Sequence, residues 1–257
     1  MVRRMKAIKR RKAIYEYLQA QSVSSVAMFA KRFNVSSMTI RRDLSIMEGQ
    51  SLIQRSYGKA TIKQKQPEVS EYEFRVNQHL KEKQTIAAQA VKLIENGQSI
   101  YIDSSSTTNL VLEMITPDIS PVIYTNSVSA INILIHKPWV KVFVFGGMLS
   151  NAVQCLDYST TMIPSTELYF DIAFTSCCGF DKKQIYNNDL ISVNERRIML
   201  TNSARRVLLT DSSKLYVSGL FSICKWDMID DFITDQALPA DLSTVLKQED
   251  VNLQITR

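Results

Sequence analysis

Residues 23–60 constrain the fold more than any other part of the chain. Their sequence, VSSVAMFAKRFNVSSMTIRRDLSIMEGQSLIQRSYGKA, predicts two short helices, a tight turn between them, and a β-hairpin. Ser24 or Ser25 can cap the first helix by accepting from its free N–H groups. Asn34 suits the turn, because Asn tolerates left-handed backbone. The helical spacing of the apolar side chains Val26, Phe29 and Ala30 turns them inward. This order of elements predicts a winged helix-turn-helix.

The second of these helices opens at Ser36 and ends near Gly49. Ile40, Leu44 and Met47 share the face that we expect to be buried. In a helix-turn-helix, the N-terminal turn of the second helix contacts base edges in the major groove. The hairpin has strands at 52–55 and 60–63 around a turn at 56–58, and forms the wing. The candidate DNA-binding residues are therefore Ser36, Ser37, Met38, Thr39, Arg41, Arg42, Arg55, Tyr57 and Lys59.

The distribution of charge supports a nucleic-acid partner. Residues 1–66 hold 15 Lys and Arg against 3 Asp and Glu, a net charge of +12, whereas the remaining residues sum to −6. A charged helix alone is more often a solvated surface than a binding site. A basic patch confined to one end of a chain is the electrostatic signature of nucleic-acid binding, since each cation near a phosphate releases counterions. We therefore expect duplex DNA as a partner.

Composition limits the remaining possibilities. An apolar fraction of 45% supports a substantial core, and no apolar run approaches the roughly 20 residues of a membrane span. Cys155, Cys177, Cys178 and Cys224 lack metal-ligand spacing, and the two histidines, His79 and His136, have no second ligand nearby. We expect no metal, no cofactor and no membrane contact, and a cytoplasmic protein with reduced thiols.

After residue 80 the pattern alternates between helix and strand. Helices are predicted at 82–95, 107–115, 127–134 and 194–204, and strands at 99–102, 122–125, 140–145, 172–176, 207–210 and 232–234. Such alternation predicts an α/β domain with a parallel sheet. Residues 64–75 are polar and indicate a linker or a short connecting helix. We therefore expect a winged helix-turn-helix domain at 1–63, a linker at 64–76 and an α/β domain at 77–257.

Small polar residues follow four of the predicted strands. In open α/β sheets, ligands bind outside the carboxyl ends of the strands, where hydroxyls and free N–H groups suit an anion. Ser and Thr after a strand are often ordinary caps and turns, so their shared placement carries the argument. The candidate ligand-binding residues from these loops are Asp103, Ser104, Ser105, Ser106, Thr107, Thr108, Thr125, Asn126, Ser127, Gly146, Gly147, Asp211 and Lys214.

Short motifs occur in both halves of the chain: TIRRDL and IQRSYGKA in the first, and IDSSSTT, TNS, FGG, CCGFD, TDSSK and ITD, in that order, in the second. The first set resembles the DNA-binding domain, and the second set the sensor domain, of the DeoR family of bacterial transcriptional regulators. The resemblance implies a fold similar to sugar-phosphate isomerases and a phosphorylated sugar as effector, and adds Gly179 to the ligand loops. The chain departs from the family with Ser105 in place of a common Gly and Tyr57-Gly58-Lys59-Ala60 in place of His-Gly-Gly-Ala. The family has a helix with acidic and Lys residues, and Glu195 and Arg197 are the nearest equivalents of those residues in this chain.

These observations together predict a homo-oligomeric repressor of carbohydrate-metabolism genes that binds an operator and a sugar phosphate. Two alternatives remain open. The first is an isomerase-like enzyme fused to a DNA-binding head, for which Asp103, Asp189 and Asp211 are available carboxylates. The second is an oligomeric DNA-binding protein that responds to no effector.

Overall fold

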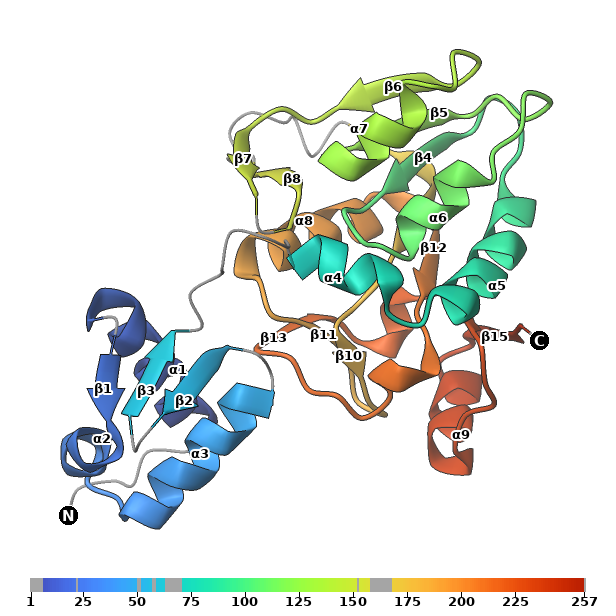
Figure 1. The fold of residues 1–257 in the computed structure, drawn as a ribbon. Coiled ribbons are helices and arrows are strands. Elements are labelled where there is room, and N and C mark those ends of the chain that lie inside the picture. The colour runs from blue at the N-terminus through green and yellow to red at the C-terminus, as the bar shows by residue number, and fades with distance from the viewer. Residues whose placement is uncertain are drawn as a thin grey trace. The chain divides into compact units, whose positions relative to one another are not determined.

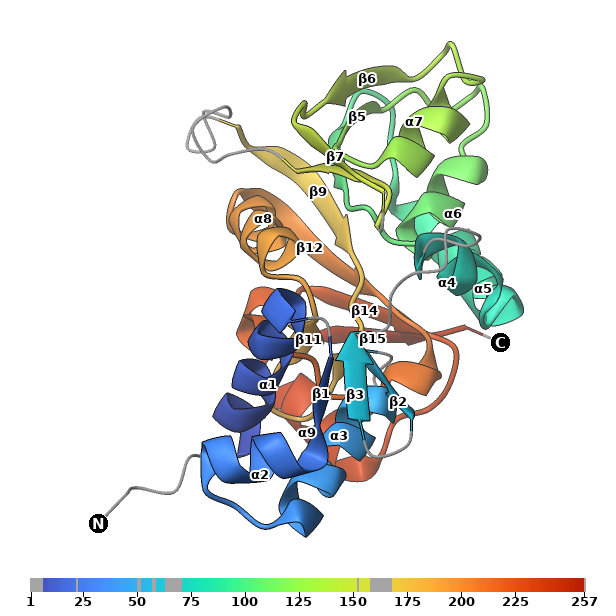
Figure 2. The ribbon, with the colours of Figure 1, turned by 60° about the vertical axis from the view of Figure 1, so that its left-hand side comes forward.

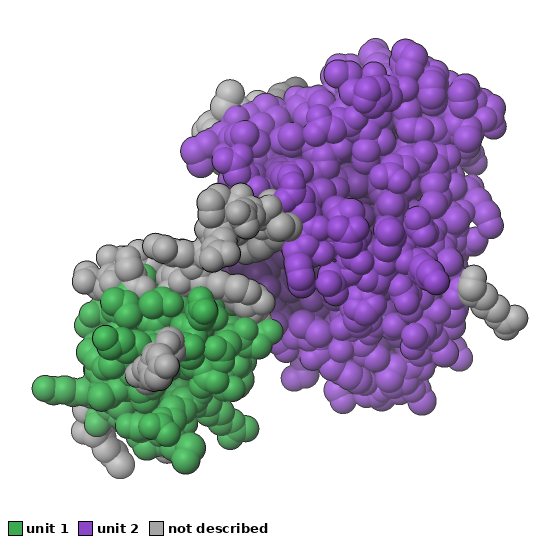
Figure 3. All heavy atoms as spheres, viewed as in Figure 1, with its two compact units in different colours: residues 1–68 green, residues 69–257 purple. Residues whose placement is uncertain are grey.

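The chain divides into two compact units, residues 1–68 and residues 69–257, which Figure 3 colours separately. The structure is a computed structural model that describes residues 7–21, 23–49, 52–56, 59–62, 71–151, 153–157 and 168–256. The first unit encloses one cluster of buried apolar side chains, and the second unit encloses two. Helix α4 (Glu71–Asn77) belongs to the second unit, whereas the sequence assigned all of its residues but the last to the linker or a short connecting helix.

The first unit is a winged helix-turn-helix, as predicted (Figure 1). Strand β3 pairs antiparallel with both of its neighbours, giving the order β1-β3-β2. Strand β1 was not predicted, because its three residues also fit a loop before the helix. The tip of the hairpin, Tyr57 and Gly58, lies outside the described residues. The elements are α1 (Ala7–Gln21), β1 (Val23–Ser25), α2 (Val26–Phe33), α3 (Ser37–Gly49), β2 (Ile53–Ser56) and β3 (Lys59–Ile62).

Local hydrogen bonds fix the turn between α2 and α3. Ser25 caps α2 by accepting from the Met28 N–H at 3.1 Å. Asn34 ends that helix in the left-handed conformation with φ 50°, as its residue type predicts. The expected inward residues Ile40, Leu44 and Met47 are buried. They pack with Ile14, Leu18 and Phe29, so one core joins the three helices.

The second unit is built on a parallel sheet with the order β15-β14-β12-β9-β4-β5-β6. Strands β4 and β5 have the predicted bounds, and the other predicted strands are confirmed to within a few residues. The chain adds β5 and β6 on one side of β4, and β9, β12, β14 and β15 on the other. The order therefore reverses between β4 and β9. The strands are β4 (Ser99–Ile102), β5 (Val122–Thr125), β6 (Lys141–Val144), β9 (Phe170–Thr175), β12 (Ser203–Leu209), β14 (Asp231–Thr234) and β15 (Asn252–Ile255).

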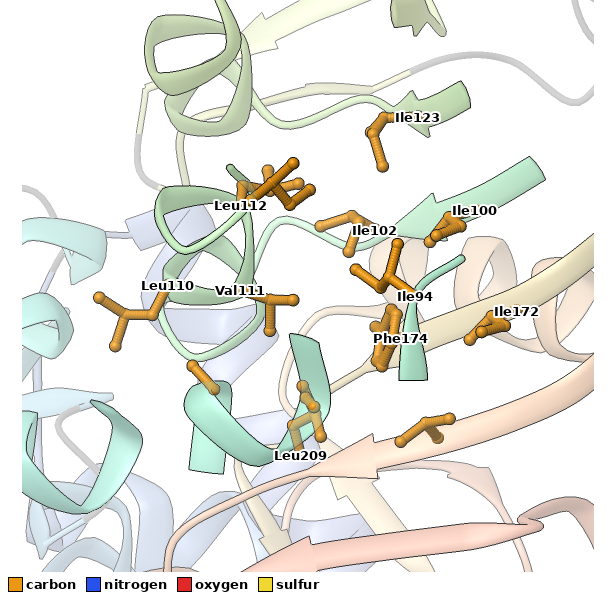
Figure 4. Close-up of a cluster of buried hydrophobic side chains, with 14 of the residues drawn as sticks. Ile94, Ile100, Ile102, Leu110, Val111, Leu112, Ile123, Ile172, Phe174 and Leu209 are labelled. Carbon is orange, nitrogen blue, oxygen red and sulfur yellow. The ribbon is translucent and has the colours of Figure 1, made fainter. Parts of the chain in front are cut away.

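This reversal places helices on both faces of the sheet, because crossovers between parallel strands are right-handed. Helices α5 (Leu80–Ala90), α6 (Thr108–Glu113) and α7 (Val128–Leu134) cover one face, over the hydrophobic cluster in Figure 4. Helices α8 (Leu190–Thr201) and α9 (Ala240–Gln248) belong to the other face, where their apolar residues are buried in a second cluster. Figure 2 shows the ribbon from a second direction.

Shorter elements complete the second unit. They include the hairpin of β7 (Met148–Ser150) and β8 (Cys155–Asp157), a small sheet of β10 (Gly179–Phe180), β11 (Ile185–Asn187) and β13 (Phe221–Cys224), and the 3-10 turns η1 (Val91–Leu93), η2 (Ser212–Lys214) and η3 (Trp226–Met228). Of these elements, only η1 was anticipated, as the end of the helix predicted at 82–95. No helix within the described ranges is both long and apolar enough to cross a bilayer.

Candidate functional site

The N-terminal half of α3 presents an open polar surface. Ser36 caps the helix by accepting from the Thr39 N–H at 3.2 Å, and the two hydroxyls lie 2.9 Å apart. Met38 is 75% exposed, and Arg41 and Arg42 are also exposed. Ser37 belongs to the same exposed turn. The helical residues predicted to contact DNA therefore project away from the core, which a helix inserted into a groove requires.

Arg55, a predicted DNA contact, is held by Glu48 at the end of α3. Its Nε lies 2.6 Å from Oε2 of Glu48, and its backbone N–H donates to Oε1 at 3.1 Å. The hydrogen bond from Arg55 lowers the pKa of Glu48, so the carboxylate stays ionised. The pair links β2 of the wing to the recognition helix. Lys59, at the start of β3, is exposed.

A buried ion pair joins the inward face of α3 to α1. Nε of Arg10 on α1 donates to Oδ2 of Asp43 on α3 at 2.6 Å, and both side chains are about 5% exposed. Sequence reasoning did not single out Asp43, although it follows the buried Ile40 by three residues and therefore lies on the same side of the helix. Removing one partner of such a pair leaves a buried charge without compensation. Arg10 and Asp43 thus constrain how α1 and α3 pack.

A pocket of about 270 Å³ opens in the second unit at the carboxyl ends of β4, β9 and β12. These are neighbouring strands at the point where the strand order reverses, the usual place for a ligand in an open α/β sheet. Six predicted ligand residues line it: Ser104, Ser105, Ser106, Thr107, Asp211 and Lys214. Residues that the sequence did not predict to bind ligand complete the wall: Phe74, Arg75, Gln78, His79, Lys83, Val153, Ser176, Cys177, Cys178, Asn187, Asn188, Asp189, Ser192 and Arg196.

Lys83 is a buried cation of this pocket. Its Nζ donates to the carbonyl of Arg75 and, at 3.1 Å, to Oγ of Ser106. Burial lowers its pKa to about 8, so an anion that restores electrostatic compensation favours the charged form. Lys214 and Arg75 add positive charge to the same pocket. Burial also raises the pKa of the Cys178 thiol to about 11, so this group is neutral.

Asp211 is one of two carboxylates that line the pocket, together with Asp189. Its side chain is buried, and Oδ1 accepts from the backbone N–H and the hydroxyl of Ser213. Oδ2 has no hydrogen-bond partner among the described residues. A buried acceptor without a donor is costly, so this oxygen is suited to accept from a ligand hydroxyl. Cations beside a carboxylate with an open acceptor oxygen fit a ligand that is both anionic and hydroxylated.

Asp103 supports the pocket from beneath. Its Oδ1 accepts from the Ser105 N–H and the Thr108 hydroxyl, and its Oδ2 accepts from the Thr175 hydroxyl. Oδ2 also lies 2.8 Å from Nε of Arg196. The two groups form an ion pair, although the N–H of Arg196 does not point at the carboxylate. Thr108 and Asp103 thus shape the loop without lining the cavity. Ser105 has no positive φ, and its hydroxyl accepts from the Thr108 N–H at 3.1 Å, so this loop accommodates Ser without backbone strain.

The other predicted ligand residues lie outside the lining of the pocket. Thr125, Asn126 and Ser127 are buried and bonded to protein groups, with Ser127 capping α7. Gly146 and Gly147 are exposed after β6, which lies at the sheet edge, away from β9 and β12 in the strand order. Gly179 is buried, and a Cβ there would lie 2.0 Å from the carbonyl oxygen of Val217, so its role is close packing.

A buried carboxyl lies next to Arg196 on α8. Glu195 accepts from the Tyr101 hydroxyl and from Nδ2 of Asn126, each at 2.7 Å. Burial raises the pKa of Glu195 to about 7. Arg197, the other residue suggested by the resemblance, instead donates to the carbonyls of Ser222 and Ile223. Neither residue lines the pocket, and no group of three or more His, Cys, Asp or Glu among the described residues is placed to hold a metal ion.

Comparison with known proteins identifies both units. Residues 10–66 match the model of the DeoR-like helix-turn-helix domain, and residues 78–236 match that of the DeoR C-terminal sensor domain. An L-fucose operon activator of Haemophilus influenzae is 29% identical, over 93% of this chain and 96% of its own length. A glycerol-3-phosphate regulon repressor of Escherichia coli is 25% identical, over 98% of this chain and 100% of its own.

A winged-helix head followed by a sensor domain with an internal pocket defines a ligand-responsive transcription regulator. The chain belongs to the DeoR family of transcriptional regulators. Among solved structures, ribose 5-phosphate isomerase A from Methanocaldococcus jannaschii is 19% identical with a TM-score of 0.37, covering 52% of this chain and 53% of its own. That similarity is too distant to bear on the activity of this chain.

Proposed function

We propose that this regulator represses carbohydrate-metabolism genes as a homo-oligomer in the cytoplasm, and that a phosphorylated sugar bound in the pocket changes its affinity for an operator. The observation that carries the effector class is the placement of Lys83 and Lys214 together with the unpartnered Oδ2 of Asp211 in one cavity. Cations suit a phosphoryl group, and a carboxylate oxygen suits a sugar hydroxyl. A volume of about 270 Å³ matches a small ligand.

We infer the oligomer from the small number of DNA contacts that one DNA-binding unit can make. One winged helix contacts few phosphates and bases, whereas a symmetric pair binds two half-sites of an operator. The sign of regulation rests on the glycerol-3-phosphate regulon repressor, to which this chain is similar along that protein's full length. Footprinting and reporter assays with the promoter of the chain's own gene cluster test both points. Activation in place of repression would overturn the proposed sign.

A thermal-shift panel tests the effector class. Pentose and hexose phosphates and inorganic phosphate should stabilise the protein, whereas the matched sugars without phosphate should not. A ligand of the native state at 100 times its Kd adds about 2.7 kcal/mol to the free energy of unfolding. Lys83→Met should abolish the shift, and Lys81→Met, an exposed residue of the same helix, is the matched control. If no phosphorylated compound stabilises the protein, the effector proposal is wrong and the effector-independent alternative is favoured.

We propose that the chain is not an isomerase, because its relatives are transcription regulators and Asp103 is committed to Arg196, Ser105 and Thr175. Asp189 likewise caps α8 by accepting from Ser192. Following the conversion between aldose and ketose phosphates with the purified protein tests this. Turnover that Asp211→Asn abolishes would instead establish an enzyme.

A further inference from the structure

One wall of the pocket is made by α4, the first described element after the residues that join the two units along the chain. Phe74 and Arg75 of α4, and Gln78 and His79 directly after it, line the cavity. A ligand in the pocket therefore meets the segment that continues through residues 63–70 to the DNA-binding unit. The opposite side of the pocket belongs to the sheet and its loops.

Hydrogen bonds at Tyr72 and at Arg75 attach α4 to the body of the second unit. The hydroxyl of Tyr72 accepts from Nδ2 of Asn109 on α6 at 2.7 Å, and both side chains are buried. The carbonyl of Arg75 accepts from Nζ of Lys83 on α5. Phe74 is 63% exposed, so this aromatic ring adds little burial. A helix of seven residues has too few internal hydrogen bonds to be stable alone, so its order depends on such attachments.

Both attachments start from elements that carry the anion-binding groups. Lys83 also donates to Ser106, and Asn109 follows the Ser104–Thr108 loop directly on α6. An ammonium group has three donors, and Lys83 uses two of them within the protein. A phosphoryl group between Lys83 and Arg75 would receive charge-assisted hydrogen bonds from α5 and from α4 at once. The ligand would thus bridge α4 to the body.

We propose that α4 is the element that couples the pocket to the DNA-binding unit: an anionic ligand held by Arg75 and Lys83 fastens α4 to the body and restricts the arrangements available to the head. The inference rests on the proposed function, because it requires that the pocket hold a phosphoryl group. Coupling arises since the ligand binds the fastened state of α4 more tightly than the loose state. Tyr72 is the positioning residue of this device, because it attaches α4 without lining the cavity.

Hydrogen exchange of the full-length protein tests the coupling, with inorganic phosphate as the probe. Amide exchange in α4 should slow by about tenfold or more on adding phosphate, as expected for one added charge-assisted hydrogen bond. The amides of α9, which contributes no residue to the pocket, should not change. Tyr72→Phe should speed exchange of α4 in the free protein, whereas Tyr169→Phe, which alters a residue 67% exposed, should leave it unchanged.

The outcomes separate the two proposals. If phosphate stabilises the protein through Lys83 but exchange in α4 is unchanged, α4 is not the coupling element, while the effector proposal stands. If phosphate and sugar phosphates all fail to bind, both proposals fail. A gel-shift titration completes the test. Because Tyr72→Phe shifts the free protein toward the loose state of α4, it should change the ratio of operator affinities with and without phosphate, and a ratio equal to that of the unaltered protein would overturn the role of Tyr72.

Discussion

Replacing Glu195 by Gln should change how the stability of the C-terminal unit depends on pH. Glu195 is buried between Tyr101 and Asn126, and burial raises its pKa from an ordinary 4.5 to about 7. Between these two pH values, the folded protein keeps a proton that the unfolded chain has lost. The folded state therefore binds more protons, and its stability falls as pH rises from about 4.5 to about 7.

The magnitude follows from the two pKa values. Each unit of difference corresponds to about 1.36 kcal/mol, so ionising Glu195 costs roughly 2–3 kcal/mol of stability between pH 5 and pH 8. Gln has nearly the same shape and does not titrate. Tyr101 still donates to its amide oxygen, and Asn126 can turn its Oδ1, which has no hydrogen-bond partner among the described residues, toward the new amide group. Glu195→Gln should therefore gain roughly 2–3 kcal/mol over the unaltered protein across this pH range.

Urea unfolding followed by tryptophan fluorescence measures this difference. Both tryptophans, Trp139 and Trp226, lie in the second unit, so the signal reports that unit alone. Glu113→Gln, which alters an exposed carboxylate on α6, controls for the loss of one charge. If the free energies of unfolding of Glu195→Gln and the unaltered protein differ by the same amount at pH 5 and pH 8, then Glu195 does not titrate in this range and the reasoning is refuted.

Four further perturbations have defined outcomes. Burial lowers the pKa of Lys83 to about 8, so its ammonium group loses its proton as pH rises through that value. The affinity for inorganic phosphate, measured by calorimetry, should therefore fall by up to about tenfold per pH unit above about pH 8. An affinity that stays constant to about pH 9.5 would exclude Lys83 from binding. Arg41→Ala should weaken specific operator binding by roughly 1–3 kcal/mol in a gel shift if it contacts a guanine. Lys59→Ala should reduce the salt dependence of binding by about one counterion for all sequences, and an unchanged slope would argue against a phosphate contact. Gly179→Ala places a Cβ against Val217 and should lower the free energy of unfolding by roughly 1–3 kcal/mol, whereas an unchanged urea midpoint would show that the backbone relaxes.

Strong local patterns made much of the fold predictable. Strands β4 and β5 are short apolar runs between polar residues, and the structure places them at the predicted bounds. Ser25, Asn34 and Ser36 punctuate the helix-turn-helix through hydrogen bonds that their residue types favour. Helix α9 and strand β15 were missed. The sequence of β15, NLQI, is half polar, and only its pairing with β14 makes it a strand.

The pocket residues were predictable only where the order of strands along the chain determines which loops lie together. Loops that follow parallel strands meet at one edge, and the loops after β4 and β12 do line the pocket. Sequence position does not show which way a side chain turns, so Asp103 and Asn126 proved to bond within the protein. The burial of Lys83 could have been predicted from its helical spacing. It precedes Ile86, Ala87 and Ala90 by three, four and seven residues, and all four are buried on one helical face.

The recognition helix divides its residues between two tasks. Ile40, Asp43, Leu44 and Met47 anchor α3, while Met38, Arg41 and Arg42 face outward and bury little. If these outward residues contact bases, as we propose, a substitution there should alter which bases are preferred at little cost to the fold. Promoter preference can diverge between duplicated genes by a few such exchanges while the metabolite that is sensed remains the same. The same division makes the outward positions the natural targets for redirecting this regulator to a chosen promoter.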